Sequence, residues 1–211
     1  GILAVSGALG LIFGGWRLAV LTVAGFVALG LLGLWEASII TLGLVLAAVV
    51  LALLIGIPLG IIAGRSKRVA AFLSPILDVM QIMPTMAYLA PMVLLFLIGG
   101  PSATIATLIY AIPPAIRITA LGIRGVGATT VEAAVSLGST RWQVLTKVQL
   151  PLARRTIGIG VNQTIMMALS MVVITALIGT PGLGDSILRA VRAVDVGAAF
   201  DAGLAIVILD I

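Results

Sequence analysis

The 211 residues contain neither cysteine nor histidine. Without cysteine the chain has no disulfide and no thiolate chemistry. Without histidine it lacks the commonest metal ligand and the side chain that titrates near neutral pH. These absences disfavour an enzyme, and we predict neither a catalytic residue nor a metal site in this chain.

Charged residues are also scarce, at 9% of the sequence, whereas 62% of the residues are hydrophobic. A soluble globule of this length needs more polar surface, so we expect most of the chain to lie in a lipid bilayer. The net charge of +5 comes from Lys and Arg that cluster between apolar runs. That pattern is typical of cytoplasmic loops of membrane proteins, so we expect no nucleic-acid partner.

Long apolar runs follow one another along the chain, and a spanning helix needs about 20 residues. The pattern predicts an all-α, polytopic membrane protein with about five to seven transmembrane helices. The runs lie at 2–15, 18–34, 37–64, 82–100, 103–123, 156–179 and 196–211. Pro58 lies inside the third run and is expected to bend it.

Two basic clusters predict how the chain is oriented. The first, residues 65–68, follows the third run, and the second lies within residues 124–155. Two predicted crossings separate the clusters, so both are expected on the cytoplasmic side. The sequence "GTPGLGD", residues 179–185, then falls outside the cell and is predicted to form a tight turn.

The segment 129–155 is the longest stretch without a bilayer-length apolar run. Thr129 and Glu132 have the spacing of a capping box and predict a helix over about 130–137. Gly138 is suited to end that helix in a left-handed conformation. The predicted result is a short amphipathic helix that stops at a glycine corner.

A second short helix is predicted directly after this corner. Thr140 and Gln143 repeat the capping spacing, and Pro151 is expected to end the helix. A pair of amphipathic helices that lies on anionic lipid is one interpretation of the whole segment. A helix-turn-helix that reads DNA is disfavoured, because the flanking sequences are membrane spans.

The same segment resembles the cytoplasmic loop of permease subunits in ATP-binding-cassette importers. The matching residues are Glu132-Ala133-Ala134, Gly138 and Leu150-Pro151. The stretches "YAIPPAIRITALGIRGV" and "VNQTIMMALSMVVITALIGTPGLGDSI" are similar to the glycine betaine and proline betaine branch of that family. The resemblance covers residues 37–211, a permease domain that includes the coupling loop 129–155. Residues 1–36 are expected to add peripheral N-terminal membrane helices.

The resemblance implies a multi-pass subunit in a prokaryotic plasma membrane that works with several partners. The implied partners are ATPase subunits that bind ATP and Mg, a second permease copy, and an extracytoplasmic substrate-binding protein or fused domain. No cofactor is expected in this chain itself. Transport of betaine-type osmoprotectants during osmotic stress is the implied function.

Two stretches are candidates for the translocation path. Asn162, Met166 and Ser170 repeat at four-residue spacing, with Gln163, Met167 and Met171 on the neighbouring row. Helix–helix packing glued by polar side chains explains these rows equally well. In "QIMPTMAY" Pro84 is expected to break a helix, so that Met83 and Tyr88 lie near the entrance and Tyr88 offers its ring to a cation.

Scattered charges and few aromatic residues set the remaining expectations. Asp78 is expected near a span end, and Arg117 at a helix break after Pro113-Pro114 or reaching to the interface. The chain has only three Trp and two Tyr, dispersed, so tight binding of a quaternary ammonium by an aromatic cage is expected in a partner. Alternatives are a permease for choline, carnitine, a sulfonate or an amino acid. An ion-coupled secondary carrier is a further alternative, although it needs intramembrane carboxylates.

Overall fold

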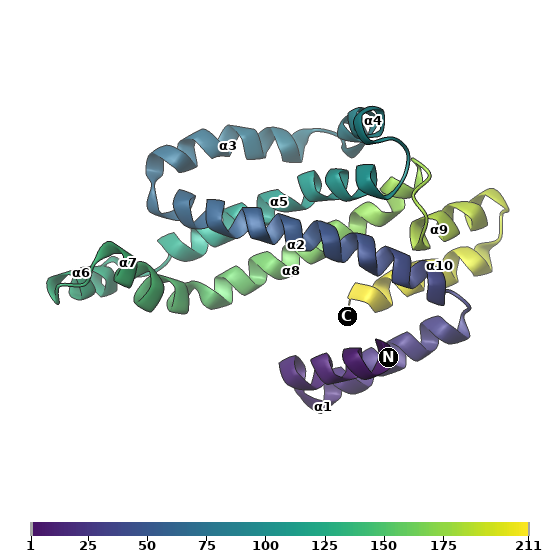
Figure 1. The fold of residues 1–211 in the computed structure, drawn as a ribbon, viewed down its shortest axis with the longest axis horizontal. Helices are drawn as coiled ribbons and strands as arrows, with labels where there is room; N and C mark the ends of the chain where they lie inside the picture. The colour runs from purple at the N-terminus through teal and green to yellow at the C-terminus, as the bar shows by residue number, and fades with distance from the viewer. Residues whose placement is uncertain (1, 211) are drawn as a thin grey trace. The chain divides into compact units, whose positions relative to one another are not determined.

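The structure is a computed structural model that describes the backbone of residues 2–210 and the side chains of residues 16–17 and 19–209. The described residues form helices and short connections without a β-strand, which confirms the predicted all-α class. In chain order the helices are α1 (Ile2–Leu31), α2 (Trp35–Arg65), α3 (Lys67–Ile82), α4 (Thr85–Phe96), α5 (Gly100–Arg124), α6 (Ala128–Ser136), α7 (Arg141–Gln143), the π-helix η1 (Val144–Gln149), α8 (Leu150–Ala176), α9 (Leu183–Arg192) and α10 (Val196–Asp210) (Figure 1).

Helices that are long and apolar enough to span a bilayer make up a large part of this length. Three helical stretches are long and apolar enough to cross a bilayer, namely Trp35–Arg65, Gly100–Arg124 and Arg141–Ala176. The pair α3 and α4, bent by 94°, qualifies as a fourth span. Ala19–Leu31 and Val196–Leu209 are shorter apolar helices. The number of crossings, expected at about five to seven, stays a prediction.

Several predicted boundaries differ from the structure. The runs expected at 2–15 and 18–34 lie on the single helix α1, and the side chains of residues 2–15 lie outside the described residues. The run expected at 82–100 is divided, because α3 ends at Ile82 and α4 covers only Thr85–Phe96. Met83 has an extended backbone, with φ −61° and ψ 131°. Residues before proline avoid the helical region, so the predicted break at Pro84 is confirmed.

The chain divides into two compact units, and each is described by itself. One unit consists of the segment up to Leu46, Leu89–Thr104 and the segment from Leu169 onward. Leu29, Leu183 and Ala205 form its buried core. The Thr41 hydroxyl accepts a hydrogen bond of 2.8 Å from the Leu183 N–H, which attaches the start of α9 to α2. The predicted turn before α9 is confirmed, because Gly179 and Gly182 have positive φ angles of 76° and 130°.

The other unit consists of Ala47–Tyr88 and Ile105–Ala168, and it holds the segments of interest. In it, glycines on α2 face small or β-branched residues on α5. A Cβ added at Gly56, Gly60 or Gly64 would lie 2.6–2.7 Å from a Cβ atom of Ala115, Thr119 or Ile123, respectively. Small residues let membrane helices approach this closely, and the matched ascending order shows that α2 and α5 run in parallel.

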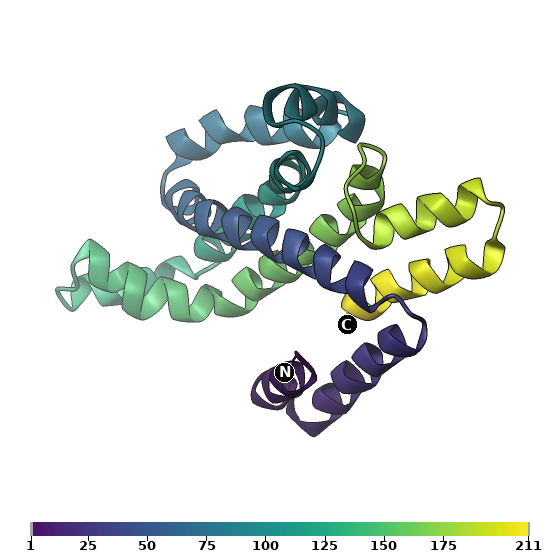
Figure 2. The same ribbon diagram turned by 45° about the vertical axis from the view of Figure 1, so that its right-hand side comes forward.

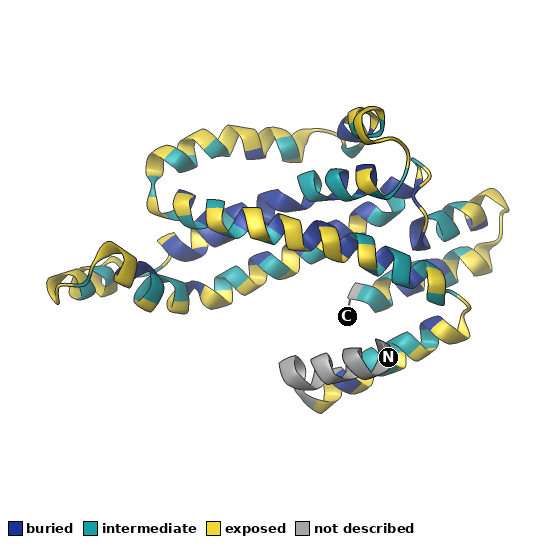
Figure 3. Cartoon of the chain, in the orientation of Figure 1, coloured by how far each residue is buried: buried dark blue, intermediate teal, exposed yellow. Residues whose placement is uncertain are grey.

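Helix α5 lies between neighbours on more than one side. Ala52 on α2, Leu77 on α3, and Ile112 and Ile116 on α5 form a common core. Gly122 would meet Thr156 of α8 at 3.1 Å if it carried a Cβ. Of the three long apolar helices, α5 is also the most enclosed (Figure 3). In its most apolar 18-residue segment 56% of the residues are buried, against 33% in α2 and 28% in Arg141–Ala176.

Candidate functional site

The segment between α5 and α8 extends beyond the ends of the long helices of its unit (Figures 1 and 2). Its first element, α6, begins at Ala128 with Gly127 as N-cap and without a side-chain capping bond. The predicted capping box at Thr129 and Glu132 is therefore wrong. Gly127 starts the helix two residues earlier, so Thr129 lies inside α6, and Glu132 is exposed.

The glycine corner is confirmed. Gly138 has a φ of +80°, and its N–H donates to the Val135 carbonyl at 2.9 Å. The Ser139 N–H donates to the Ala134 carbonyl at 3.1 Å. These two bonds make a Schellman motif, which satisfies the last carbonyls of α6 and needs a left-handed residue at the position of Gly138.

The second capping box is confirmed as well. The Thr140 hydroxyl accepts from the Gln143 N–H at 3.3 Å, and the Gln143 side chain accepts from the Thr140 N–H at 2.8 Å. The end of α6 and the start of α7 are thus both fixed by residues between Gly138 and Gln143. The corner between α6 and α7 is defined by hydrogen bonds rather than by a flexible loop.

Pro151 does not end the second helix, contrary to the prediction. Helix α7 continues through the π turn η1 into α8, and Arg141–Ala176 is one helical stretch of 36 residues. In the π turn the Leu150 N–H donates to the Leu145 carbonyl, one residue further back than in an α-helix. This wider turn accommodates the proline ring and the missing N–H. The surface segment is therefore continuous with a membrane span.

Apolar packing and one arginine side chain attach this segment to the long helices of the same unit. Leu145 is buried against Ile123 of α5 and Ala153 of α8, and Leu150 packs at the edge of this cluster. Arg65 at the end of α2 donates to the Arg141 carbonyl at 3.1 Å. The base of the segment is thus fixed to both α2 and α5.

Charge and exposure distinguish the base of the segment from its tip. Arg65, Arg124 and Arg141 line a hollow of about 500 Å³ at the base. In the described part of the chain, the carboxylate ion pairs are Arg117 with Asp78 and Arg189 with Asp185, so none involves these three arginines. At the tip, Leu137 is 87% exposed and Trp142 69% exposed. A positively charged base and an exposed apolar tip suit docking to another protein.

The residues predicted for coupling occupy different parts of this segment. Glu132, Ala133 and Gly138 are exposed near the tip, Ala134 is half-buried, and Leu150 and Pro151 lie at the start of α8. The structure therefore places four of the six at the tip and two at the base. Their role in coupling stays a prediction.

The residues predicted for the path lie on α8 and around the α3–α4 break. Asn162, Met166 and Ser170 are exposed in this chain, and the Asn162 amide lies 3.9 Å from the Met166 sulfur. On the neighbouring row Gln163 is exposed, Met167 half-buried and Met171 fully buried. The first row is thus available to line a passage, whereas Met171 packs inside the subunit.

The two predicted path residues near the α3–α4 break also differ in exposure to solvent. Met83 is exposed, and Tyr88 is buried at 6% exposure. The Tyr88 hydroxyl has no hydrogen-bond partner among the described residues. The ring is buried in this arrangement, and the predicted role of Tyr88 as a cation-binding surface stays a prediction.

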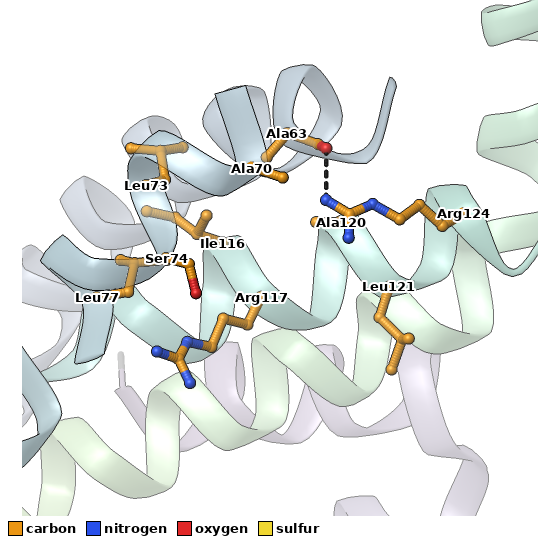
Figure 4. Close-up of a pocket in the computed structure, with 10 residues that line it drawn as sticks. All are labelled: Ala63, Ala70, Leu73, Ser74, Leu77, Ile116, Arg117, Ala120, Leu121 and Arg124. Carbon is orange, nitrogen blue, oxygen red and sulfur yellow. Dashed lines mark hydrogen bonds between the residues drawn. The ribbon is translucent and has the colours of Figure 1, made fainter. Parts of the chain in front are cut away.

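One pair of charged residues was not predicted as part of a site. Helix α5 continues through Pro113 and Pro114, so Arg117 lies at no helix break, and its guanidinium pairs with the Asp78 carboxylate of α3. Arg117 also lines a cavity of about 310 Å³ together with Ser74 and Arg124 (Figure 4). Arg117 lies inside the run predicted at 103–123, but Asp78 precedes the run predicted at 82–100, so the apolar runs did not indicate this pair.

Comparisons with known proteins establish the family. Residues 56–210 match the family described as binding-protein-dependent transport system inner membrane component. This match covers most of the chain. The chain belongs to this family. It is therefore a membrane-embedded component of a transport system, as its apolar helices require.

Relatives of this permease have named substrates. It is 46% identical over 194 residues to the glycine betaine transport system permease protein OpuAB of Bacillus subtilis, covering 92% of this chain and 69% of the relative. It is 47% identical over 197 residues to the glycine betaine/proline betaine permease ProW of Escherichia coli, covering 93% of this chain and 56% of the relative. It is 42% identical over 208 residues to the trimethylamine N-oxide permease TmoV of Ruegeria pomeroyi, covering 99% of this chain and 32% of the relative.

A solved structure confirms the permease fold. An inward-facing conformation of the MetNI methionine ABC transporter matches with a TM-score of 0.74 and 19% identity. The match covers 81% of this chain and 86% of that chain. The predicted fold of an importer permease is thus confirmed. The resemblance to the betaine branch, inferred from sequence motifs, agrees with the relatives above.

Proposed function

We propose that this permease is the membrane subunit of an ATP-driven importer for glycine betaine and proline betaine. Identities of 46% and 47% with OpuAB and ProW support the substrate class. The observation that carries the mechanism is the structured corner at Gly138, which leads into a helix continuous with a membrane span. A stiff connection of this kind can transmit a movement at the surface into the membrane.

In this proposal the energy comes from outside the chain. ATPase subunits bind ATP and Mg and dock on the exposed tip formed by α6 and α7. When they close, they displace the tip, and the continuous helix Arg141–Ala176 changes its position against α5. A second permease copy completes the passage, and the two subunits alternate between outward and inward access. A ligand or partner drives such a switch only through its differential affinity for the two states.

Initial recognition of the solute is assigned to a separate or fused extracytoplasmic binding protein. A betaine keeps its quaternary ammonium charge at every pH, and tight binding of such a cation uses an aromatic cage. The three Trp and two Tyr of this chain are dispersed among its segments, and Tyr88 is buried. In this arrangement the permease supplies a gated route and catalyses no reaction.

Reconstitution tests the proposal. The permease is purified with its ATPase and binding-protein partners and placed in vesicles, and uptake is measured for glycine betaine, proline betaine, trimethylamine N-oxide, choline, carnitine and proline. We expect ATP-dependent uptake of the two betaines that ionophores do not abolish. Uptake driven by a sodium or proton gradient without ATP would instead identify a secondary carrier.

Trimethylamine N-oxide is the second candidate substrate. The similarity to TmoV, at 42% identity over 99% of this chain, favours it. This compound has the trimethylated nitrogen of glycine betaine but no carboxylate. Competition between the two solutes for uptake in the same vesicles ranks them.

A further inference from the structure

The Asp78–Arg117 pair joins α3 to α5 several residues in from the basic ends of the two helices. Asp78 lies 11 residues after Lys67, the first residue of α3, and Arg117 lies 7 residues before Arg124, the last of α5. At 1.5 Å per residue these spacings correspond to about 16 Å and about 10 Å from the basic ends of the two helices. For helices that run along the bilayer normal from a membrane surface at Lys67 and Arg124, both distances fall within a hydrocarbon core about 30 Å thick.

Both side chains of this pair are partly exposed. Arg117 is 39% exposed and Asp78 51% exposed in the subunit. A charged side chain that faces hydrocarbon at this depth costs at least about 2.5–3.5 kcal/mol, so such residues face protein or a water-filled space. The exposed sides of Asp78 and Arg117 therefore border an aqueous space or another subunit rather than lipid.

Arg117 of this pair lines a cavity of about 310 Å³, whereas Asp78 is not among the lining residues (Figure 4). Ser74, Arg117 and Arg124 supply its polar wall, and Leu73, Leu77 and Ile116 are among its apolar residues. The Ser74 hydroxyl lies 3.5 Å from the second carboxylate oxygen of Asp78, while the first oxygen pairs with Arg117. The cavity thus has a cation in its wall, and the anion paired with that cation lies next to the Ser74 and Arg117 side chains.

This arrangement complements a zwitterion. A quaternary ammonium has no N–H to donate, so it associates with a carboxylate through charge alone, whereas a carboxylate accepts paired hydrogen bonds from a guanidinium. We infer that Asp78 and Arg117 form a transit site at which a zwitterionic quaternary ammonium solute contacts both residues during its passage. This inference rests on the proposed function, and it names the residues that meet the solute.

Passage requires that the solute leave the site readily. When the solute enters, its ammonium group approaches Asp78 and its carboxylate approaches Arg117, so one ion pair is replaced by two and the net charge of the site stays the same. The residues that line the cavity include no aromatic side chain, so the cage needed for tight binding is missing there. Weak, charge-matched contact suits a route between two aqueous compartments.

Thiol labelling in the complete transporter tests this site. The 211 residues contain no cysteine, so a cysteine introduced as Ser74→Cys can be followed on its own peptide by mass spectrometry. The reagent is a water-soluble methanethiosulfonate with a trimethylammonium group. We expect Ser74→Cys to react, and glycine betaine to slow the reaction severalfold relative to the same concentration of trehalose. Leu54→Cys, at an exposed apolar position of α2, is the control that should stay unreactive.

A double variant that neutralises both charges distinguishes contact with the solute from simple packing of α3 on α5. In Asp78→Asn/Arg117→Gln, which removes both charges and keeps both side chains polar, the thiol should still react but glycine betaine should no longer protect it. Retained protection in this variant, or an unreactive Ser74→Cys, overturns the inference. If Ser74→Cys disrupts assembly, Leu121→Cys on the same cavity replaces it.

Uptake by vesicles with the wild-type transporter distinguishes failure of the proposed function from failure of the transit site. If the wild type takes up neither betaine, the proposed function fails. If it transports glycine betaine with ATP but the labelling is not slowed, only the transit site fails.

Discussion

At the scale of single residues, the left-handed glycine at position 138 decides the geometry of the coupling segment. A side chain at Gly138 would meet no atom within 4 Å, so any effect of substitution there comes from the backbone angle. Gly138→Val should disfavour the corner by about 1–2 kcal/mol, because a Cβ clashes with the carbonyl in the left-handed conformation. We expect an inserted subunit whose ATP-driven uptake falls by about tenfold.

The matched control for this variant is Gly158→Val. Gly158 lies inside α8, also has no atom within 4 Å of an added Cβ, and has no positive φ. It should leave uptake nearly unchanged. Normal ATP-driven uptake by Gly138→Val would contradict the role of the corner.

A second residue-scale prediction concerns Thr41. Its hydroxyl is the acceptor for the buried Leu183 N–H, so Thr41→Val keeps the volume but leaves that N–H without a partner. The cost is about 1–3 kcal/mol. We expect the midpoint of thermal unfolding in detergent to fall by roughly 2–4 °C for each kcal/mol.

Thr164→Val is the comparison for Thr41→Val. Thr164 is equally buried, but its hydroxyl donates at 2.8 Å to the Gly160 carbonyl of its own helix. That carbonyl keeps a backbone donor when the hydroxyl is removed, so the loss should be smaller. Equal losses for the two variants would show that the Thr41 hydrogen bond has no special role.

Residue-scale features were predicted unevenly from the sequence. Gly138 and the Thr140–Gln143 box were predicted correctly, because left-handed glycine and capping chemistry act over a few residues. The same spacing at Thr129 and Glu132 misled, because Gly127 allowed α6 to begin earlier. The pairing of Asp78 with Arg117 depends on how α3 packs on α5, which no local pattern contains.

At the scale of elements, the glycines of α2 fix its contact with α5. A Cβ at Gly60 would lie 2.6 Å from the Thr119 Cβ and 2.8 Å from the Ile116 carbonyl oxygen. The backbone oxygen cannot rotate away, so Gly60→Ala should force the helices apart at a cost of about 1–3 kcal/mol. We expect a lower thermal midpoint and a lower yield of folded subunit.

Gly43→Ala tests the same exchange on the same helix without the close contact. No atom lies within 4 Å of an added Cβ at Gly43, and alanine favours a helix over glycine by about 1 kcal/mol. This variant should be neutral or slightly stabilising. A loss of stability as large as that of Gly60→Ala would argue against the close α2–α5 contact.

The expected end of the second short helix was the largest error at the element scale. Proline ends an α-helix in most settings, and the prediction at Pro151 used that rule. The rule assumes regular α-helical hydrogen bonds, and the π turn Val144–Gln149 replaces them before the proline is reached. Nothing in the sequence marked the change from α to π hydrogen bonding.

At the scale of the whole molecule, composition and apolar runs predicted the fold class and membrane location. The runs at 37–64 and 103–123 correspond closely to α2 and α5. The run at 82–100 was wrong, because its apolar residues include the α3–α4 break and the connection to α5. Apolar composition reports that a segment avoids water, but it does not report where the helix bends.

Membrane sidedness is a further prediction at this scale. The basic clusters place the tip of the coupling segment in the cytoplasm and the start of α10 outside. Leu137 and Val196 are 87% and 79% exposed, so a cysteine at either position is accessible. In intact cells an impermeant maleimide should label Val196→Cys, and should label Leu137→Cys only after permeabilisation. The reverse pattern would show that the orientation is inverted.

The π turn has a consequence for the phase of the helix that contains it. Each residue of an α-helix advances the side chain direction by about 100°, and a π turn holds one residue more than the α turn it replaces. The turn Val144–Gln149 therefore sets the angular offset between the face that α7 presents at the surface and the face that α8 presents in the membrane. A regular α-helix with the same number of residues would rotate the two faces by about 100° relative to each other. In a subunit with such a helix, a movement at the α7 surface would be transmitted to a different face of α8 in the membrane.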